Sequence, residues 1–452
     1  MDEIEKNDKT VNNKAKLFHR VISGSIWSGI GGGLSSVLML LAGVLVARLL
    51  GSSLFGEYSM IRSTINMSVL LAGLSLGSTA SKFIASFREN DLEKTASVIS
   101  SSRAVALFGG FVFAAILIGF SDFFSEIVFN SQTMGTYIAI SGVICFFSAV
   151  NGAQSGALAG FEEFQVLAII RVLAALVSLP VIYIGALYFQ VVGAVVGLLI
   201  SAFLNFILHY LALKKVIIKH LVPLTYKVKF DELIFLLKFA VPITLSSLLV
   251  APVIWACNAM LVNMDSNGFA ELGIYEAANQ FKVAMLFIPS LLVQTILPII
   301  SNFSASTEKG GLGSIIKYQL IINIVTTSLI AIPVIFLAGS LMSLYGSDFA
   351  VGKDVLIILS VTAILSSVAY VTGQVVIGVG NAWHAVLINS MWAIIVISST
   401  YVFVNKGYGA IGVAYANLIS YIALSFIQIV YVSLHKRGMI DSKISLTGIE
   451  NQ

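Results

Sequence analysis

The chain has 452 residues, of which 58% are hydrophobic and 11% are charged, and its formal net charge at pH 7 is +4. Soluble proteins carry roughly 25% charged residues, so this chain has too few ionisable groups to cover a surface in water. The composition excludes an ordinary soluble enzyme, a disordered chain and a coiled coil. The cysteines, Cys145 and Cys257, lie in apolar runs and are too few for a disulfide framework or a zinc site, so we expect buried thiols.

The apolar residues fall into segments long enough to cross a bilayer as α-helices, which needs about 20 residues each. The predicted spans are 22–48, 58–84, 97–120, 136–160, 165–188, 192–213, 235–262, 274–300, 314–338, 352–378, 383–404 and 409–433. These runs are too long and too continuous for the alternating strands of a membrane β-barrel. The expected fold is an all-α polytopic membrane protein with about 12 transmembrane helices.

The positive charges indicate how the spans are oriented. With a cytoplasmic N-terminus and alternating spans, 21 of the 26 Lys and Arg residues lie on the cytoplasmic side, as the positive-inside rule requires. We therefore expect a multi-pass protein of the cytoplasmic membrane with both termini in the cytoplasm. The expected organisation is an N-terminal tail at 1–20, an N-lobe at 21–218, a basic linker at 219–230, a C-lobe at 231–435 and a C-terminal tail at 436–452. We interpret the positive charge of the linker as a signal that keeps it in the cytoplasm. The alternative interpretation is that it binds lipid headgroups.

Short motifs recur in the two halves of the chain. LGSSLFGEY at 50–58 matches NGFAELGIY at 267–275, with two glycines and a tyrosine at one offset of 217 residues. Further pairs match at offsets of 220 and 216 residues, namely 154–160 with 374–380 and 193–197 with 409–413. Six spans per half is an even number, so the halves have the same orientation, as in parallel-repeat transporters. We predict two pseudo-symmetric six-helix lobes around a central cavity.

Two stretches carry a family resemblance. ARLLGSSLFGEYSMIRSTINMSVLLAGLSLGSTASKFIA at 47–85 and QSGALAGFEEFQ at 154–165 resemble the polysaccharide-transporter branch of the multidrug/oligosaccharidyl-lipid/polysaccharide exporter superfamily, which includes the O-antigen flippases. The resemblance covers about residues 17–435. It implies alternating access by two lobes and a cargo of undecaprenyl-pyrophosphate-linked oligosaccharide, flipped for O-antigen, capsule or other surface polysaccharide. It also implies polysaccharide polymerase and chain-length machinery as partners, with no nucleic acid.

Cations within the spans are candidates for binding an anionic headgroup, because an intramembrane charge is costly and usually functional. The deepest are Arg62, Arg171 and Lys282. Each also has a structural alternative. Arg62 could extend to the outer headgroups, Lys282 could pair with Glu276, and Arg171 could pair with an acid just before its span.

Helical periodicity places two of these cations on polar stripes. Residues four apart on a helix share a face, so each stripe occupies an arc of about 60–80°. The predicted cavity stripes are Tyr58, Arg62 and Asn66 in the N-lobe, and Tyr275, Asn279 and Lys282 in the C-lobe. The repeat offset relates the two helices, so both lobes are expected to line one cavity.

A second pair of positions matches near the cytoplasmic ends of two spans. Gln154 and Gly160 correspond to Gln374 and Gly380. Because small residues allow close helix packing, we expect these positions to serve packing. The alternative role is a cytoplasmic gate.

No enzyme motif is present: the sequence lacks a phosphate-binding glycine loop, and its histidines form no metal-like pair. We expect a transporter that is not an enzyme and has no metal or cofactor, with a coupling ion, H⁺ or Na⁺, left open. The main alternative is a cation-coupled multidrug or organic-cation antiporter of the same superfamily. That function would require an ion-binding acid in the N-lobe, where Glu57 lies near the outer surface.

Overall fold

The computed structural model describes residues 2–131, 133–223, 234, 236, 244, 249–294, 312–378 and 382–447. Within these ranges the secondary structure is helical and contains no strand. The first half contains α1 (Asp2–Gly73), α2 (Leu76–Phe87), α3 (Leu92–Gly119), α4 (Ser121–Phe123), η1 (Phe124–Val128), α5 (Met134–Gly160) and α6 (Phe164–Lys219). The second half contains α8 (Ala251–Met264), α9 (Gly268–Met285), α10 (Phe287–Gln294), α12 (Leu312–Phe336), α13 (Ala338–Ser343), η2 (Ser347–Gly352), α14 (Lys353–Gly378), α15 (Ala382–Asn405) and α16 (Gly409–Thr447).

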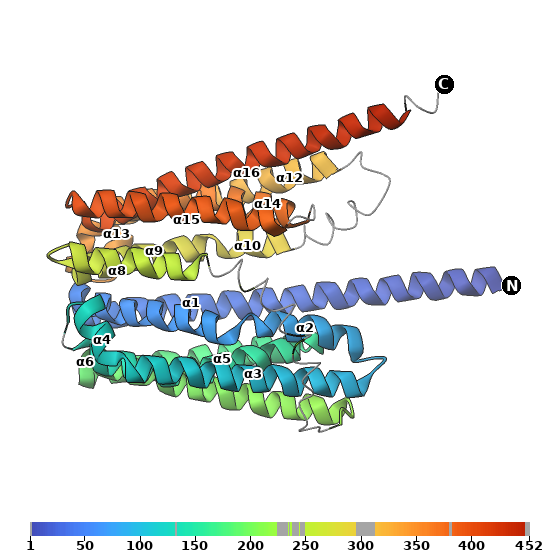
Figure 1. Cartoon of the computed structure of the whole chain (residues 1–452), viewed down its shortest axis with the longest axis horizontal. Helices are drawn as coiled ribbons and strands as arrows, with labels where there is room; N and C mark the ends of the chain where they lie inside the picture. The colour runs from blue at the N-terminus through green and yellow to red at the C-terminus, as the bar shows by residue number, and fades with distance from the viewer. Residues whose placement is uncertain are drawn as a thin grey trace.

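The helices form two bundles that lie side by side (Figure 1). Helices α1 to α6 make the N-lobe, and α8 to α16 make the C-lobe. Both ends of the chain lie at the same end of the molecule, which we call the terminal end, and the opposite end is the distal end (Figure 1). The expected all-α fold with two lobes is confirmed.

Two long helices each contain a break that returns the chain through the bundle (Figure 1). In α1 the break is at Gly51, whose φ of 72° suits glycine because it has no Cβ. In α6 it is at Phe189 and Gln190. The two arms of α6 then pack backbone to backbone, since a Cβ on Gly185 would lie 2.7 Å from the carbonyl carbon of Gly193. Each helix therefore supplies two of the predicted spans.

Eight of the described helices are long and apolar enough to cross a membrane. Counting α1 and α6 twice accounts for ten of the predicted spans. The predicted span 274–300 begins within α9 and continues through α10, and part of span 235–262 lies outside the described residues. The predicted linker 219–230 also lies mostly outside them. Helix α1 begins at Asp2 and α16 extends to Thr447, so both predicted tails largely continue the helices.

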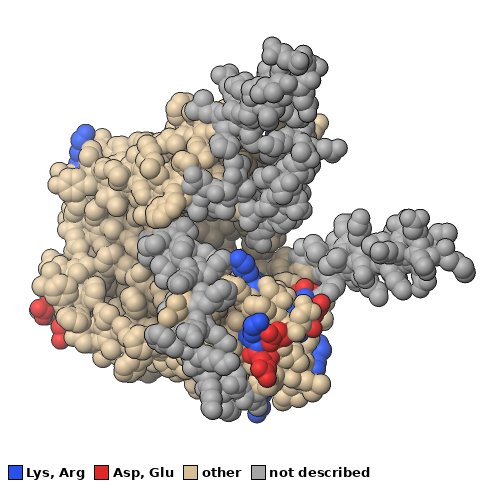
Figure 2. All heavy atoms as spheres, turned by 45° about the vertical axis from the view of Figure 1, so that its right-hand side comes forward, with Lys and Arg blue, Asp and Glu red and all other residues tan. Residues whose placement is uncertain are grey.

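The sides of the molecule are apolar, while the charged side chains lie toward its ends (Figure 2). Large side chains such as Phe108 and Phe336 are 72% and 84% exposed, as expected for surfaces that face lipid. Figure 2 shows broad uncharged sides, with Lys, Arg, Asp and Glu gathered on the N-lobe at the terminal end. There Arg88 pairs with Glu162 and donates to the Gly160 carbonyl over 2.8 Å. Such a distribution fits a protein whose sides are in the bilayer and whose ends are in water.

Candidate functional site

The repeated glycines bring the two lobes into contact at the distal end. A Cβ on Gly56 would overlap the Phe269 carbonyl and lie 2.6 Å from its carbon. A Cβ on Gly273 would overlap the Ser52 carbonyl oxygen and lie 3.2 Å from the backbone nitrogen of Gly56. Glycine permits this close approach of α1 and α9 because it has no side chain. The motif pair found in the sequence therefore forms one inter-lobe contact.

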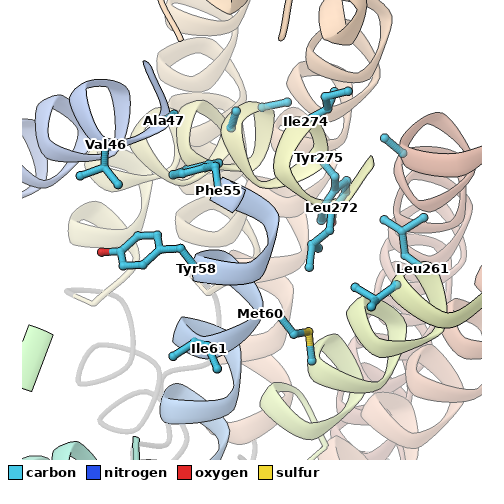
Figure 3. Close-up of a cluster of buried hydrophobic side chains, with 14 of the residues drawn as sticks. Val46, Ala47, Phe55, Tyr58, Met60, Ile61, Leu261, Leu272, Ile274 and Tyr275 are labelled. Atoms are coloured by element: carbon cyan, nitrogen blue, oxygen red, sulfur yellow. The ribbon is translucent and has the colours of Figure 1, made fainter. Parts of the chain in front are cut away.

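Aromatic and aliphatic side chains extend this contact into an apolar layer. Phe55 is fully buried, and its ring centroid lies 6.3 Å from that of Tyr345 and 5.8 Å from that of Phe349. Figure 3 shows Phe55 and Met60 of α1 in one cluster with Leu261 of α8 and residues of α9. We call this layer, together with the Gly56–Gly273 contact, the distal seal. It closes the distal end by packing residues from both lobes.

Polar contacts from α8 also join the lobes. Trp255 Nε1 donates to Thr64 Oγ1 over 3.0 Å, and Asn258 Nδ2 donates to Ser63 Oγ over 3.4 Å. Asn263 donates to the carbonyl of Val128. These bonds hold α8 of the C-lobe against the second arm of α1 and η1 of the N-lobe.

A cavity of about 330 Å³ lies within the N-lobe, between α1, α5 and α6. Its cations are Arg62 of α1 and Arg171 of α6. The other polar lining residues are Ser35, Asn66, Ser148, Ser178, Ser201 and Asn205. The described residues that line it include no acid. We call this space the N-lobe compartment, and its charge is positive.

A larger cavity of about 630 Å³ lies between the lobes. It shares Ser35, Met39, Arg62 and Asn66 with the N-lobe compartment, so the two spaces adjoin at the two arms of α1. We call it the inter-lobe compartment. Both volumes lie in the range of roughly 300–1,000 Å³ that is typical of ligand sites.

The C-lobe wall of the inter-lobe compartment has a different chemistry. Helix α9 contributes Glu276, Asn279 and Gln280, and α14 contributes Tyr370. Glu276 accepts hydrogen bonds from Asn258 Nδ2 at 3.2 Å and from Asn279 Nδ2 at 3.3 Å. The carboxylate is thus held by two amides on a wall that faces Arg62.

Four of the seven predicted cavity residues line the two compartments: Arg62, Asn66, Arg171 and Asn279. The acids just before the span of Arg171 have other partners, because Glu162 pairs with Arg88 and Glu163 with Lys219.

Tyr58 does not line either compartment. It is 4% exposed, and its ring centroid lies 5.8 Å from the guanidinium carbon of Arg62, a distance at which the ring and the cation attract each other.

Tyr275 and Lys282 do not line either compartment, which differs from the predicted stripe. Tyr275 is 4% exposed and its hydroxyl accepts from Asn417 Nδ2 at 3.0 Å. Lys282 is 7% exposed, and its ammonium lies 4.9 Å from the ring centroid of Tyr421. Both partners are on α16, so this face of α9 packs inside the C-lobe.

The cavity face of α9 is instead the neighbouring one, through Glu276, Asn279, Gln280 and Val283. These positions follow the i, i+3, i+4, i+7 pattern of a single helix face. Asn279 belongs to both this face and the predicted stripe, so helical phase alone leaves the choice between the two sides open. Packing against α16 decides it. The sequence signal that marks Glu276 is its acid within a predicted span.

The glutamine and glycine candidates lie away from both compartments. Gln154 is 4% exposed within α5. A Cβ on Gly160 would lie 2.7 Å from Cβ of Ile84, so Gly160 makes a packing contact between α5 and α2. Gln374 is half-buried on α14, and Gly380 lies outside the described residues.

The described residues include no group of three or more His, Cys, Asp and Glu that could hold a metal ion. Both cysteines are free and buried, as expected.

Comparison with solved structures places this fold among known transporters. It is similar to the inward-facing conformation of a multidrug resistance MATE family transporter of the MOP superfamily, with a TM-score of 0.74, 17% identity, and coverage of 89% of this chain and 96% of that one. The outward-facing conformation gives a TM-score of 0.69 at 18% identity, covering 92% and 95%. A MOP superfamily transporter from Pyrococcus furiosus gives 0.67 at 18%, covering 92% and 96%. The chain therefore shares the overall fold of these structures.

Sequence comparison finds relatives with a named role. The EPS I polysaccharide export inner membrane protein EpsE of Ralstonia nicotianae is 24% identical over 305 residues, 66% of this chain and 68% of that protein. EpsE of Ralstonia solanacearum is 25% identical over 199 residues, where the match spans 44% of this chain and 45% of the relative's length. The family model described as "Polysaccharide biosynthesis protein" matches residues 21–304, well over half of the chain. The chain belongs to this family of polysaccharide biosynthesis proteins.

Proposed function

We propose that this protein exports polysaccharide precursors across the cytoplasmic membrane, by flipping an undecaprenyl-pyrophosphate-linked oligosaccharide between leaflets. Family membership and the EpsE relatives support polysaccharide export as the process. The transporter fold with two lobes supports alternating access as the mechanism. The lipid-linked nature of the cargo is inferred from the chemistry of the cavities.

The observation that carries the proposal is the positive N-lobe compartment. A diphosphate that leaves water requires charge-assisted hydrogen bonds, each worth roughly 1.5–3 kcal/mol. Arg62 and Arg171 supply guanidinium groups, which bind phosphate oxygens through two parallel N–H donors. Among the described residues that line this compartment, no carboxylate neutralises them. A diphosphate headgroup is therefore a better occupant than an organic cation.

The seal and the topology suggest the direction of entry. With 21 of 26 basic residues predicted on the cytoplasmic side, the terminal end faces the cytoplasm and the distal end faces outward. The distal seal then closes the outer side in this conformation. Cargo enters from the cytoplasmic leaflet and leaves after the seal opens. Polymerase and chain-length machinery would act on the exported product.

One observation favours a cation-coupled multidrug antiporter as the second candidate. Glu276 places a carboxylate on the wall of the inter-lobe compartment, where a cationic drug or a coupling ion could bind. The same wall faces Arg62, whose positive charge disfavours a cationic ligand there. Survival of drug-sensitive cells that express the protein separates the two functions: protection by the wild type that is lost in Glu276→Gln would favour the antiporter.

The direct test is glycan export in cells that lack the native gene, with the amount of protein in the membrane measured alongside. Arg62→Ala and Arg171→Ala are expected to reduce export at least tenfold, and Arg62→Lys to retain part of it. Arg48→Ala is the matched control, since Arg48 is exposed just before the break of α1 at Gly51 and lines neither compartment. Full export by a well-expressed Arg62→Ala/Arg171→Ala variant would overturn the proposal.

A further inference from the structure

The two compartments differ in chemistry although they share one wall. The N-lobe compartment contains both arginines and, among its described lining residues, no acid. The inter-lobe compartment has Glu276, Asn279 and Gln280 on its C-lobe side. A lipid-linked oligosaccharide has the same division, since its anionic diphosphate is joined directly to an uncharged or weakly charged chain of hydroxyl-rich sugars.

We infer that the diphosphate binds in the N-lobe compartment between Arg62 and Arg171, and that the first sugars bind the α9 face of the inter-lobe compartment. This inference rests on the proposed function and assigns each part of the cargo to named residues. It makes Glu276, Asn279 and Gln280 the residues that set glycan specificity.

The arginines are available to bind an anion. In the part of the chain that the structure describes, neither guanidinium has a carboxylate within ion-pair distance, and the contact made by Arg62 is with the Tyr58 ring. Arg171 has no acid among the described residues that line its compartment, and an intramembrane guanidinium without a counter-charge is costly, which indicates that an anion occupies this space during transport. Arg62 stands where the two compartments adjoin, so a diphosphate that it holds leaves the attached sugar at the inter-lobe side.

The α9 wall suits hydroxyl groups and repels phosphate. The Glu276 carboxylate has two oxygens and further lone pairs beyond the bonds from Asn258 and Asn279. A carboxylate accepts hydrogen bonds from sugar hydroxyls, and an amide both accepts and donates them, whereas a carboxylate beside a phosphate is repulsive. Tyr370, 38% exposed on the same wall, offers a ring against which a sugar can pack. The negative wall therefore keeps the diphosphate on the arginine side.

A site of this kind discriminates between glycans because a wrong glycan leaves the polar groups of the protein unpaired. A buried acid and amide that find their hydroxyl partners favour one glycan, and a sugar that lacks those hydroxyls leaves them unsatisfied. Substitutions on α9 should alter which glycan is exported, while substitutions of Arg171 should weaken the binding of every lipid-linked glycan alike.

The binding arm of the test uses the full chain in nanodiscs with two probes, undecaprenyl diphosphate without sugar and inorganic pyrophosphate. Arg171→Ala is expected to weaken undecaprenyl diphosphate binding about tenfold or more. Glu276→Gln should bind this probe as tightly as the wild type or more tightly, because a repulsive charge is removed. Pyrophosphate should compete with the lipid but bind more weakly. Equal affinity for both probes would assign the site to a free diphosphate and overturn the lipid-headgroup assignment.

The export arm compares the native glycan with unrelated lipid-linked glycans in cells, with Arg48→Ala as the control. Glu276→Gln and Gln280→Ala are expected to change the ratio between glycans at least several-fold, and Arg171→Ala to lower all of them without changing their ratio. Loss of export in Arg171→Ala with unchanged diphosphate affinity would overturn this inference and leave the proposed function standing. Full export in the double arginine variant would overturn the proposed function itself. A folded Glu276→Gln variant with unchanged glycan ratios would refute the specificity role of α9.

Discussion

Replacing Gly273 with alanine should open the distal end. The new methyl group would overlap the carbonyl oxygen of Ser52 and lie 3.2 Å from the Gly56 nitrogen. Both neighbours are backbone atoms, so no side chain can rotate away and relieve the contact. The lobes must separate there, while an open distal end has no such overlap. The substitution therefore destabilises the closed state alone.

Overpacking of this kind costs about 1–3 kcal/mol. Each 1.4 kcal/mol is a factor of ten, so the ratio of closed to open protein should fall by roughly 5- to 150-fold. Gly109→Ala provides the matched control. Its methyl group would also overlap a backbone carbonyl oxygen, that of Ala72, but both residues belong to the N-lobe. It should lower stability without shifting the equilibrium between the two states.

The assay measures thiol labelling from outside the cell. Ser59 is 5% exposed and lines the inter-lobe compartment behind the distal seal. A Ser59→Cys probe in a background without Cys145 and Cys257 should react faster with an impermeant reagent when Gly273→Ala is added. If labelling is unchanged in a folded Gly273→Ala protein, or rises equally with Gly109→Ala, the distal seal is not a gate.

Three further predictions concern stability. Arg88→Ala removes the bonds to Glu162 and to a backbone carbonyl, so it should cost about 1.5–3 kcal/mol, seen as a lower Tm in detergent. Glu271 accepts the Ala410 N–H over 2.7 Å at the start of α16, so Glu271→Ala should cost about 1 kcal/mol and Glu271→Gln less, and equal Tm values for the two would contradict the capping role. The backbone N–H of Lys94 donates to the Asp91 carboxylate over 2.9 Å and lowers its pKa below the usual value, so the stabilising effect of Asp91 should be present at neutral pH and lost as the pH falls through the lowered pKa. The Tm difference between wild type and Asp91→Ala, followed from pH 7 downward, checks this sign.

The membrane architecture could be predicted because it depends on local composition. Apolar runs of sufficient length must be helices in a bilayer, where each backbone group has to be satisfied within its own segment. The offset of 217 residues likewise identifies Gly56 and Gly273 as equivalent positions from the sequence alone. That they are neighbours at the lobe interface is seen in the tertiary structure.

The functional face of α9 could not be read in the same way. The helix carries polar residues on adjoining faces, and a rotation of about 100° per residue separates Tyr275 from Glu276. Lys282 is the more conspicuous candidate in the sequence because it is a deep cation, yet it lies over Tyr421 within the C-lobe.

Sequence alone thus determined the spans, the duplication and the presence of costly intramembrane charges, because each depends on neighbours along the chain. Tertiary structure decided which of those charges meet a cavity. Arg62 and Arg171 are 109 positions apart and come together because α1 and α6 each fold back within the N-lobe. Glu276 faces Arg62 because α16 occupies the other side of α9. Side-chain burial depends on packing between distant helices, and periodicity within one helix does not contain that information.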